Sequence, residues 1–331
     1  MNLLPPLDKG LVILVISGWL ASCNNDLEIL ATDYTVYPVV YSVLEVHRDT
    51  LAVRLTKTFR GSGSALDYAR IGDSVYFPEA RVWLEKRNGD LRVARAELIR
   101  SDLRAKSPGV FLEKPNWQYI VIRSPETEAL FTGSLSALEY HLSVEIPGMP
   151  LIFAKTKAYP PAELSAPRLT STVNFFLDPL TFAWRNSAPF SELYFRMYYS
   201  DVYQDTAIAR SLNWRDYHSV YPEDAASESV FGQDMMKRIA SQVKNDPRVI
   251  YRHVTAFQVV IVGIPADLHD YRLMAEIVPS DQIGFPVTNI VNGIGLFTSQ
   301  TLAAFNLDVD FRSRDSIMFG QYTKHLNFRY Y

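Results

Sequence analysis

The feature that most constrains the fold is a period-two alternation of side chains that recurs along the chain after residue 35. In the clearest stretch, apolar residues at every second position alternate with Arg81, Trp83 and Glu85, and Asn88-Gly89 follows. Alternation with this period is typical of half-buried strands, and Asn-Gly supplies the two positive-φ positions of a type I′ turn. The pattern therefore predicts β-hairpins and a mainly β fold.

The distribution of these strands predicts two domains. Residues 35–158 contain short alternating runs with almost no helical stretch, which favours an immunoglobulin-like β-sandwich. The segment Tyr-Pro-Pro-Ala-Glu-Leu over 159–164 has the stiff, donor-poor composition of a linker. Residues 165–331 are then expected to form a β-rich second domain with one or two helices.

Two helices are expected in this second domain. A helix near 228–244 is predicted by apolar residues that recur every four positions, which are Phe231, Met235, Ile239 and Val243. Asp246-Pro247 marks its end. A shorter helix is expected over 266–276.

The N-terminus has the composition of a bacterial export signal. Lys9 precedes an apolar run over 11–16, which is too short to cross a bilayer but has the length of a signal-peptide core. The segment ends in Leu20, Ala21, Ser22 and Cys23. This ending resembles the bacterial lipobox, in which the peptide is cut before a cysteine that carries lipid.

From this resemblance we expect a signal peptide over 1–22, a lipid anchor at Cys23 and a polar tether over 23–34. Two or three acyl chains amount to a stable anchor. The alternative is an ordinary secretory signal followed by a chance cysteine. Cys23 is the only cysteine, so the chain can form no internal disulfide and offers no cysteine nucleophile elsewhere.

Composition describes an ordinary globular protein. Hydrophobic residues make up 48% and charged residues 21% of the chain, so it can bury a real core. The formal net charge of -3 suggests neither nucleic acid nor an anionic membrane surface as a partner.

Four stretches, at 38–44, 55–61, 73–77 and 288–297, are similar to a group of uncharacterised outer-membrane lipoproteins of the phylum Bacteroidota. The order of the segments also resembles a larger lipoprotein family of unknown function that is often found beside TonB-dependent outer-membrane transporters. The family has no established activity. The resemblance implies a location and an architecture, with a transporter as a candidate partner.

No motif for catalysis or for a cofactor emerges. The six histidines include no pair at the spacing of a zinc-binding helix, and Asp267, His269 and Asp270 are more typical of a solvated helix face than of a metal site. The segments 61–64 and 292–295 are rich in glycine but lack the frames of a phosphate loop or a dinucleotide fingerprint. We therefore expect no metal, no cofactor and no catalytic residue.

Aromatic residues are the one hint of ligand binding. Tyr194, Arg196 and Tyr198 lie on one face of a predicted strand, where tyrosines could stack on sugar rings. The alternative is that the helix near 228–244 covers this face. Trp117 and Trp214 have polar neighbours and are further candidates for exposed contacts.

These observations favour a non-enzymatic binding or assembly module, anchored by lipid to the outer membrane and facing the periplasm or the cell surface. An outer-membrane transporter or another envelope protein is the candidate partner, and nucleic acid is not. Two alternatives remain open: a secreted hydrolase acting on glycans or peptides, and a purely structural envelope subunit.

Overall fold

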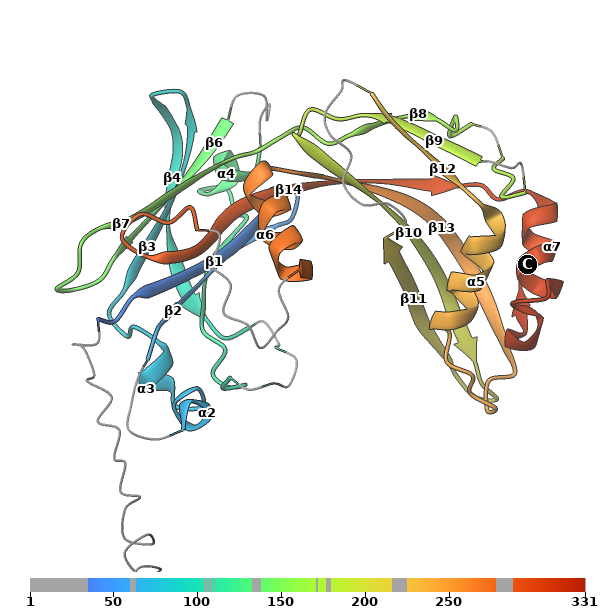
Figure 1. Cartoon of the computed structure of the whole chain (residues 1–331), viewed down its shortest axis with the longest axis horizontal. Helices are drawn as coiled ribbons and strands as arrows, with labels where there is room; N and C mark the ends of the chain where they lie inside the picture. Colours follow the sequence, from blue (N-terminus) through green and yellow to red (C-terminus); the bar gives the residue numbers. More distant parts are fainter. Residues whose placement is uncertain are drawn as a thin grey trace, which may run out of the picture. The chain divides into compact units, whose positions relative to one another are not determined.

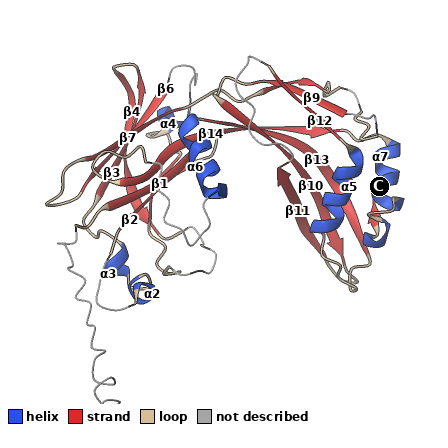
Figure 2. Ribbon diagram, in the orientation of Figure 1, coloured by secondary structure: helices blue, strands red, loops and turns tan. Residues whose placement is uncertain are grey.

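The structure is a computed structural model. It describes residues 35–59, 64–103, 106, 109, 111–132, 138–170, 172–176, 180–215, 225–277 and 288–330. The expected signal peptide, tether and lipidation site Cys23, with Leu20, Ala21 and Ser22, lie outside these residues and stay predictions. The described chain is mainly β, which confirms the predicted class (Figures 1 and 2).

Most strands of the described residues belong to one large sheet. They are β1 (Pro38–Glu45), β2 (Thr50–Lys57), β3 (Arg81–Asn88), β4 (Leu91–Ser101), β5 (Gln118–Ile122), β6 (Leu138–Glu145), β7 (Ile152–Lys157), β10 (Phe190–Val202), β11 (Ala207–Arg215), β13 (Tyr251–Ile264), β14 (Ile294–Leu307) and β15 (Phe328–Arg329). Their order is β11-β10-β13-β14-β1-β2-β5-β4-β3-β6-β7, with β15 beside β13. A smaller sheet has the order β12-β9-β8, from β8 (Glu163–Ala166), β9 (Leu180–Arg185) and β12 (Ala226–Val230).

Strand β14 pairs with strands from both ends of the sequence. Its first half runs parallel to β1, from Val39↔Ile294 to Glu45↔Gln300, and its second half runs antiparallel to β13. Gly295 makes the first pairing possible, because its φ is 114° and a Cβ there would lie 2.0 Å from the carbonyl oxygen of Val40. A segment near the C-terminus thus completes the layer that begins with β1.

The hairpin predicted at Asn88-Gly89 is present, but its turn is displaced by one residue. Asn88 still pairs with Leu91, so the two-residue loop is Gly89-Asp90, and Gly89 has a φ of 56°. A bulge between Lys86 and Arg87 shifts the register of β3 against β4. The extra residue, Val93, lies on β4, and it lets Asn88 pair with Leu91 across a two-residue loop.

Strand β7 returns to the segment just before β14. Phe153 and Val291 exchange two backbone hydrogen bonds, of 2.8 and 3.2 Å. The hydroxyl of Ser299 donates to the carbonyl oxygen of Lys157 at 2.5 Å. The path from β14 through β1 to β7 therefore closes on itself, with Val40, Leu44, Val82, Leu84 and Leu142 buried.

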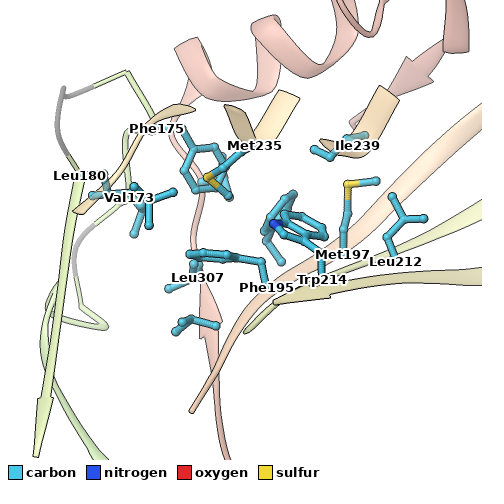
Figure 3. Close-up of a cluster of buried hydrophobic side chains, with 14 of the residues drawn as sticks. Val173, Phe175, Leu180, Phe195, Met197, Leu212, Trp214, Met235, Ile239 and Leu307 are labelled. Atoms are coloured by element: carbon cyan, nitrogen blue, oxygen red, sulfur yellow. The ribbon is translucent and has the colours of Figure 1, made fainter. Parts of the chain in front are cut away.

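The core of the C-terminal half lies between the small sheet and the strands β10, β11 and β13 (Figure 3). Trp184 and Phe195 are fully buried there. Helix α5 (Gly232–Gln242) adds Met235 and Ile239 to this core. Helix α7 (Phe311–Phe319) adds Ile317.

Helix α5 confirms the helix predicted near 228–244, although it begins later. Residues 226–230 are strand β12, and Phe231 is the extended residue that precedes the helix. Phe231 is 50% exposed, so its predicted place on the apolar face is wrong. The remaining short helices are α2 (Ala65–Tyr68), α3 (Gly72–Val75), α4 (Glu128–Phe131), the longer α6 (Ala266–Ile277) and the 3-10 turn η1 (Lys324–Leu326).

Candidate functional site

A buried carboxylate, Glu192, is the centre of a polar network on the face of β10 opposite the α5 core. Its side chain is 1% exposed. The phenol of Tyr194 donates to it at 2.8 Å, Arg215 of β11 donates at 3.3 Å, and Arg272 of α6 donates as well. Burial of a charge is tolerated only when it is paired and hydrogen-bonded, and these three donors meet that need. Burial and the adjacent Glu192 charge raise the pKa of Tyr194 to about 12.

The network continues from Glu192 in two directions. Arg215 also donates to Glu276 at 2.6 Å, which ties β11 to the end of α6. Arg272 also donates to Gln300 of β14 at 3.0 Å. Gln300 in turn donates to Glu45 of β1 at 2.7 Å. Helix α6 is therefore held against three strands of the large sheet through specific polar contacts.

The start of α6 is fixed by a second buried acid. Asp267 accepts hydrogen bonds from Thr298 at 2.9 Å, from the amide of Leu268 at 2.8 Å and from Asn289 at 2.7 Å. Burial raises the pKa of Asp267 despite these bonds. Below it, Leu268 packs with Val260, Val262, Ile264 and Leu296. The helix is thus rigidly placed over the sheet (Figure 1).

A groove of about 500 Å³ opens between α6 and the outer face of β1 and β2. We call it the α6–β1 groove; it is lined by Tyr41, Arg54, Gln118, Tyr271, Arg272 and Gln300. Its volume is in the range of small-molecule sites. No aspartate, glutamate or histidine is found among the described residues that line it.

Two tyrosines form one wall of this groove. The ring centroids of Tyr41 and Tyr271 are 5.9 Å apart, and their planes are inclined by 49°. Tyr41 is 43% exposed although it lies on a central strand. Burial of its phenol, with the nearby Tyr271, raises the pKa of Tyr41, so its hydroxyl stays protonated at neutral pH.

The groove also contains polar groups that the protein leaves unused. Arg54 lies directly across from Tyr41 in the pairing of β1 with β2. Gln118 begins β5, whose register with β2 brings it beside Arg54. Within the described part of the chain, neither side chain makes a hydrogen bond or an ion pair. A guanidinium and an amide are therefore available to a ligand.

A second groove, of about 560 Å³, lies at the far end of the β10–β11 hairpin. Its charged groups are mostly paired within the protein. Asp201 is held by Arg210 and Arg252, each at 3.0 Å, and Asp246 by Arg248 at 2.9 Å. We call it the Asp201 groove; Gln242, Lys244 and Asn245 also line it.

The structure places the predicted residues on β10 as follows. Tyr194, Arg196 and Tyr198 share one half-buried face, and Arg196 donates to the phenol of Tyr198 at 3.3 Å. The alternative that α5 covers this face is wrong, because α5 packs on the opposite face, against Phe195 and Met197. Only Tyr194 joins the Glu192 network.

The two predicted tryptophans differ. Trp214 is 4% exposed, so the prediction of an exposed contact is wrong for this residue. It lies across from Phe195 and packs among Met197 and Leu212, because the alternation along β11 turns it inward (Figure 3). Trp117 is half-buried, and the guanidinium of Arg100 lies 4.9 Å from its ring centroid. Trp117 precedes β5, away from the predicted β10 residues in the fold.

The metal site considered at Asp267, His269 and Asp270 is not formed. His269 stacks on Phe190 with ring centroids 3.9 Å apart, so it is not a simple solvated side chain either. Among the described residues no group of three or more His, Cys, Asp or Glu could hold a metal ion. No described helix is both long enough and apolar enough to span a membrane.

Comparison with known proteins gives no family. No family model and no curated protein matches the chain. Among solved structures, a chain of a 1.5-MDa bacterial ice-binding adhesin, studied for its retention at the host cell surface, matches at 11% identity with a TM-score of 0.19. The match covers 84% of this chain and 66% of that one, so this chain spans about two thirds of its length.

Proposed function

We propose that the protein is a lipid-anchored envelope protein that binds a saccharide in the α6–β1 groove and does not transform it. Cys23 is the proposed anchor, at the outer membrane. The immunoglobulin-like sandwich expected for residues 35–158 remains part of this proposal, supported by the antiparallel hairpins β1–β2, β3–β4 and β6–β7.

The observation that carries the proposal is the pairing of aromatic rings with unused donors in one rigid groove. Tyr41 and Tyr271 present ring surface on which the C–H face of a sugar can pack. Arg54 and Gln118 supply free donors for hydroxyl or acidic groups. The groups are preorganised, since Arg272 and Gln300 are already held by Glu192 and Glu45.

The chemistry of the lining favours binding over hydrolysis. Glycoside hydrolysis ordinarily requires two carboxyl groups on either side of the scissile bond. The described lining of the α6–β1 groove contains no carboxylate, and Ser42, which also borders it, is buried and donates to the carbonyl oxygen of Ala52 at 2.8 Å. The groove thus has recognition groups without an acid–base pair.

A glycan array probed with the purified mature chain tests this proposal. We expect Tyr41→Ala and Tyr271→Ala each to weaken saccharide binding about fivefold, from the loss of about 1 kcal/mol of aromatic packing. Tyr37→Ala is the matched control, because Tyr37 is 51% exposed and does not line the groove. Unchanged binding in both groove variants, or turnover of a bound glycan, contradicts the proposal.

The proposed anchor and partner need a separate experiment. Wild type and Cys23→Ala, tagged after Tyr331, are extracted from native membranes and captured. We expect only the wild type to fractionate with the outer membrane and to retain an envelope partner such as a transporter. Equal membrane association of Cys23→Ala contradicts lipidation at Cys23.

A further inference from the structure

We propose that Arg54 makes the α6–β1 groove selective for saccharides that carry a carboxylate, such as uronic acids. This inference rests on the proposed saccharide-binding function and adds the charge class of the ligand. It follows from the charges around the groove and from the geometry at Arg54.

The charges that border the groove cancel except at Arg54. On α6, the cation Arg272 is paired with buried Glu192, and Glu192 also accepts from Arg215, which is paired with Glu276. On β1, Glu45 is paired with Arg48. The four charges of Arg272, Glu192, Arg215 and Glu276 therefore cancel. The charges of Glu45 and Arg48 cancel as well. Arg54 is the remaining cation of the described lining, and no anion of the described residues is paired with it.

The position of Arg54 suits recognition of a planar anion. Its side chain is half-buried on a strand in the interior of the sheet order, where water screens a charge less than at an exposed site. A guanidinium binds a carboxylate through two parallel hydrogen bonds, and this geometry is specific as well as strong. Gln118, beside it, can accept from or donate to a neighbouring hydroxyl of the same ligand.

The two tyrosines beside Arg54 supply a surface on which a sugar ring can pack. Tyr41 is the cross-strand partner of Arg54, and the ring of Tyr271 lies beside that of Tyr41 on the same wall of the groove. A sugar packed on these rings would carry an acidic substituent toward Arg54. The combination of ring-packing surface with one free guanidinium is what distinguishes an acidic saccharide from a free inorganic anion or a neutral sugar.

The test is calorimetric titration of the full mature chain with tetragalacturonate, with its methyl ester and with cellotetraose. Methyl esterification removes the negative charge and retains the sugar. We expect the acid to bind about tenfold or more tightly than the ester, as for a hydrogen bond between charged groups, and the preference to decrease at high salt. In Arg54→Gln the preference should disappear, so that the acid and the ester bind with equal affinity.

Two further variants control the result. Arg70→Gln removes an exposed arginine outside the groove and should leave the preference intact. Arg54→Lys retains the charge and should keep part of the preference, which separates loss of charge from damage to the fold. Thermal unfolding identifies any variant that does not fold.

The outcomes separate this inference from the proposed function. Equal binding of acid and ester by wild type, a preference that survives in Arg54→Gln, or tighter binding of a sulfated than of a carboxylated tetrasaccharide overturns the carboxylate selectivity. If neutral glycans still bind and their binding depends on Tyr41, the proposed saccharide-binding function stands without the carboxylate selectivity. If no glycan binds at all, both are overturned.

Discussion

Replacing Glu192 by glutamine removes the charge at the centre of the network while it retains the shape of the side chain. Glu192 is 1% exposed, and its partners Arg215 and Arg272 are 27% and 30% exposed. Breaking a buried pair by removing one partner costs about 3–5 kcal/mol, and the partly exposed arginines recover some hydration. We therefore expect Glu192→Gln to lower the free energy of unfolding by about 3 kcal/mol.

Equilibrium urea unfolding, followed by tryptophan fluorescence, measures this change. Arg272→Gln and the double variant complete a cycle, in which we expect a coupling of about 1–3 kcal/mol. Asp234→Asn is the control, because its pair with Lys237, at 3.0 Å, joins side chains that are 58% and 48% exposed. That substitution should cost less than about 0.5 kcal/mol. Equal effects of Glu192→Gln and Asp234→Asn, or strict additivity in the cycle, would refute the role of the network.

Two further predictions concern the β layer. Gly295→Ala should destabilise the protein by about 3 kcal/mol or disrupt the pairing of β1 with β14, because a Cβ there meets the carbonyl oxygen of Val40 at 2.0 Å and φ is 114°. Gly89→Ala, with φ of 56° and no atom within 4 Å of its Cβ, should cost only about 1 kcal/mol in the same urea experiment, and equal costs would contradict the steric argument. Lys86 is fully buried and donates to the carbonyl oxygen of Thr132, and burial lowers its pKa below 10.5. A lysine whose pKa is lower in the folded state binds fewer protons there than in the unfolded state, so the free energy of unfolding of the wild type should rise with pH from the folded pKa toward 10.5. Lys86→Met should lack this rise. Parallel pH profiles of the two proteins would contradict this prediction.

Side-chain alternation predicted the β3–β4 hairpin and the two faces of β10. Along β10, Phe195 and Met197 alternate with Tyr194, Arg196 and Tyr198 as the period requires, and the fold buries the first set. The same rule, applied to β11, would have turned Trp214 inward with Leu212. Its polar neighbours in sequence misled the prediction, because they lie on the other face of the strand.

The α6–β1 groove could not be predicted, because its parts come from distant segments. Tyr41 and Arg54 lie near the start of the chain and Tyr271 and Arg272 near its end, and only the pairing of β14 with β1 brings them together. The pairing register of two strands that are far apart in the chain cannot be read from the residues of either strand alone. The amphipathic pattern did predict α6, but it could not identify the surface that the helix covers.

The position of the ligand is the most direct test of the proposed site. Amide hydrogen exchange of the mature chain, with and without saturating tetragalacturonate, measures which segments the ligand protects. We predict slower exchange in α6, β1 and β2, the elements that supply Tyr271, Tyr41 and Arg54. Protection at the Asp201 groove, in the β10–β11 hairpin and residues 242–247, with no change in α6, would contradict the assignment.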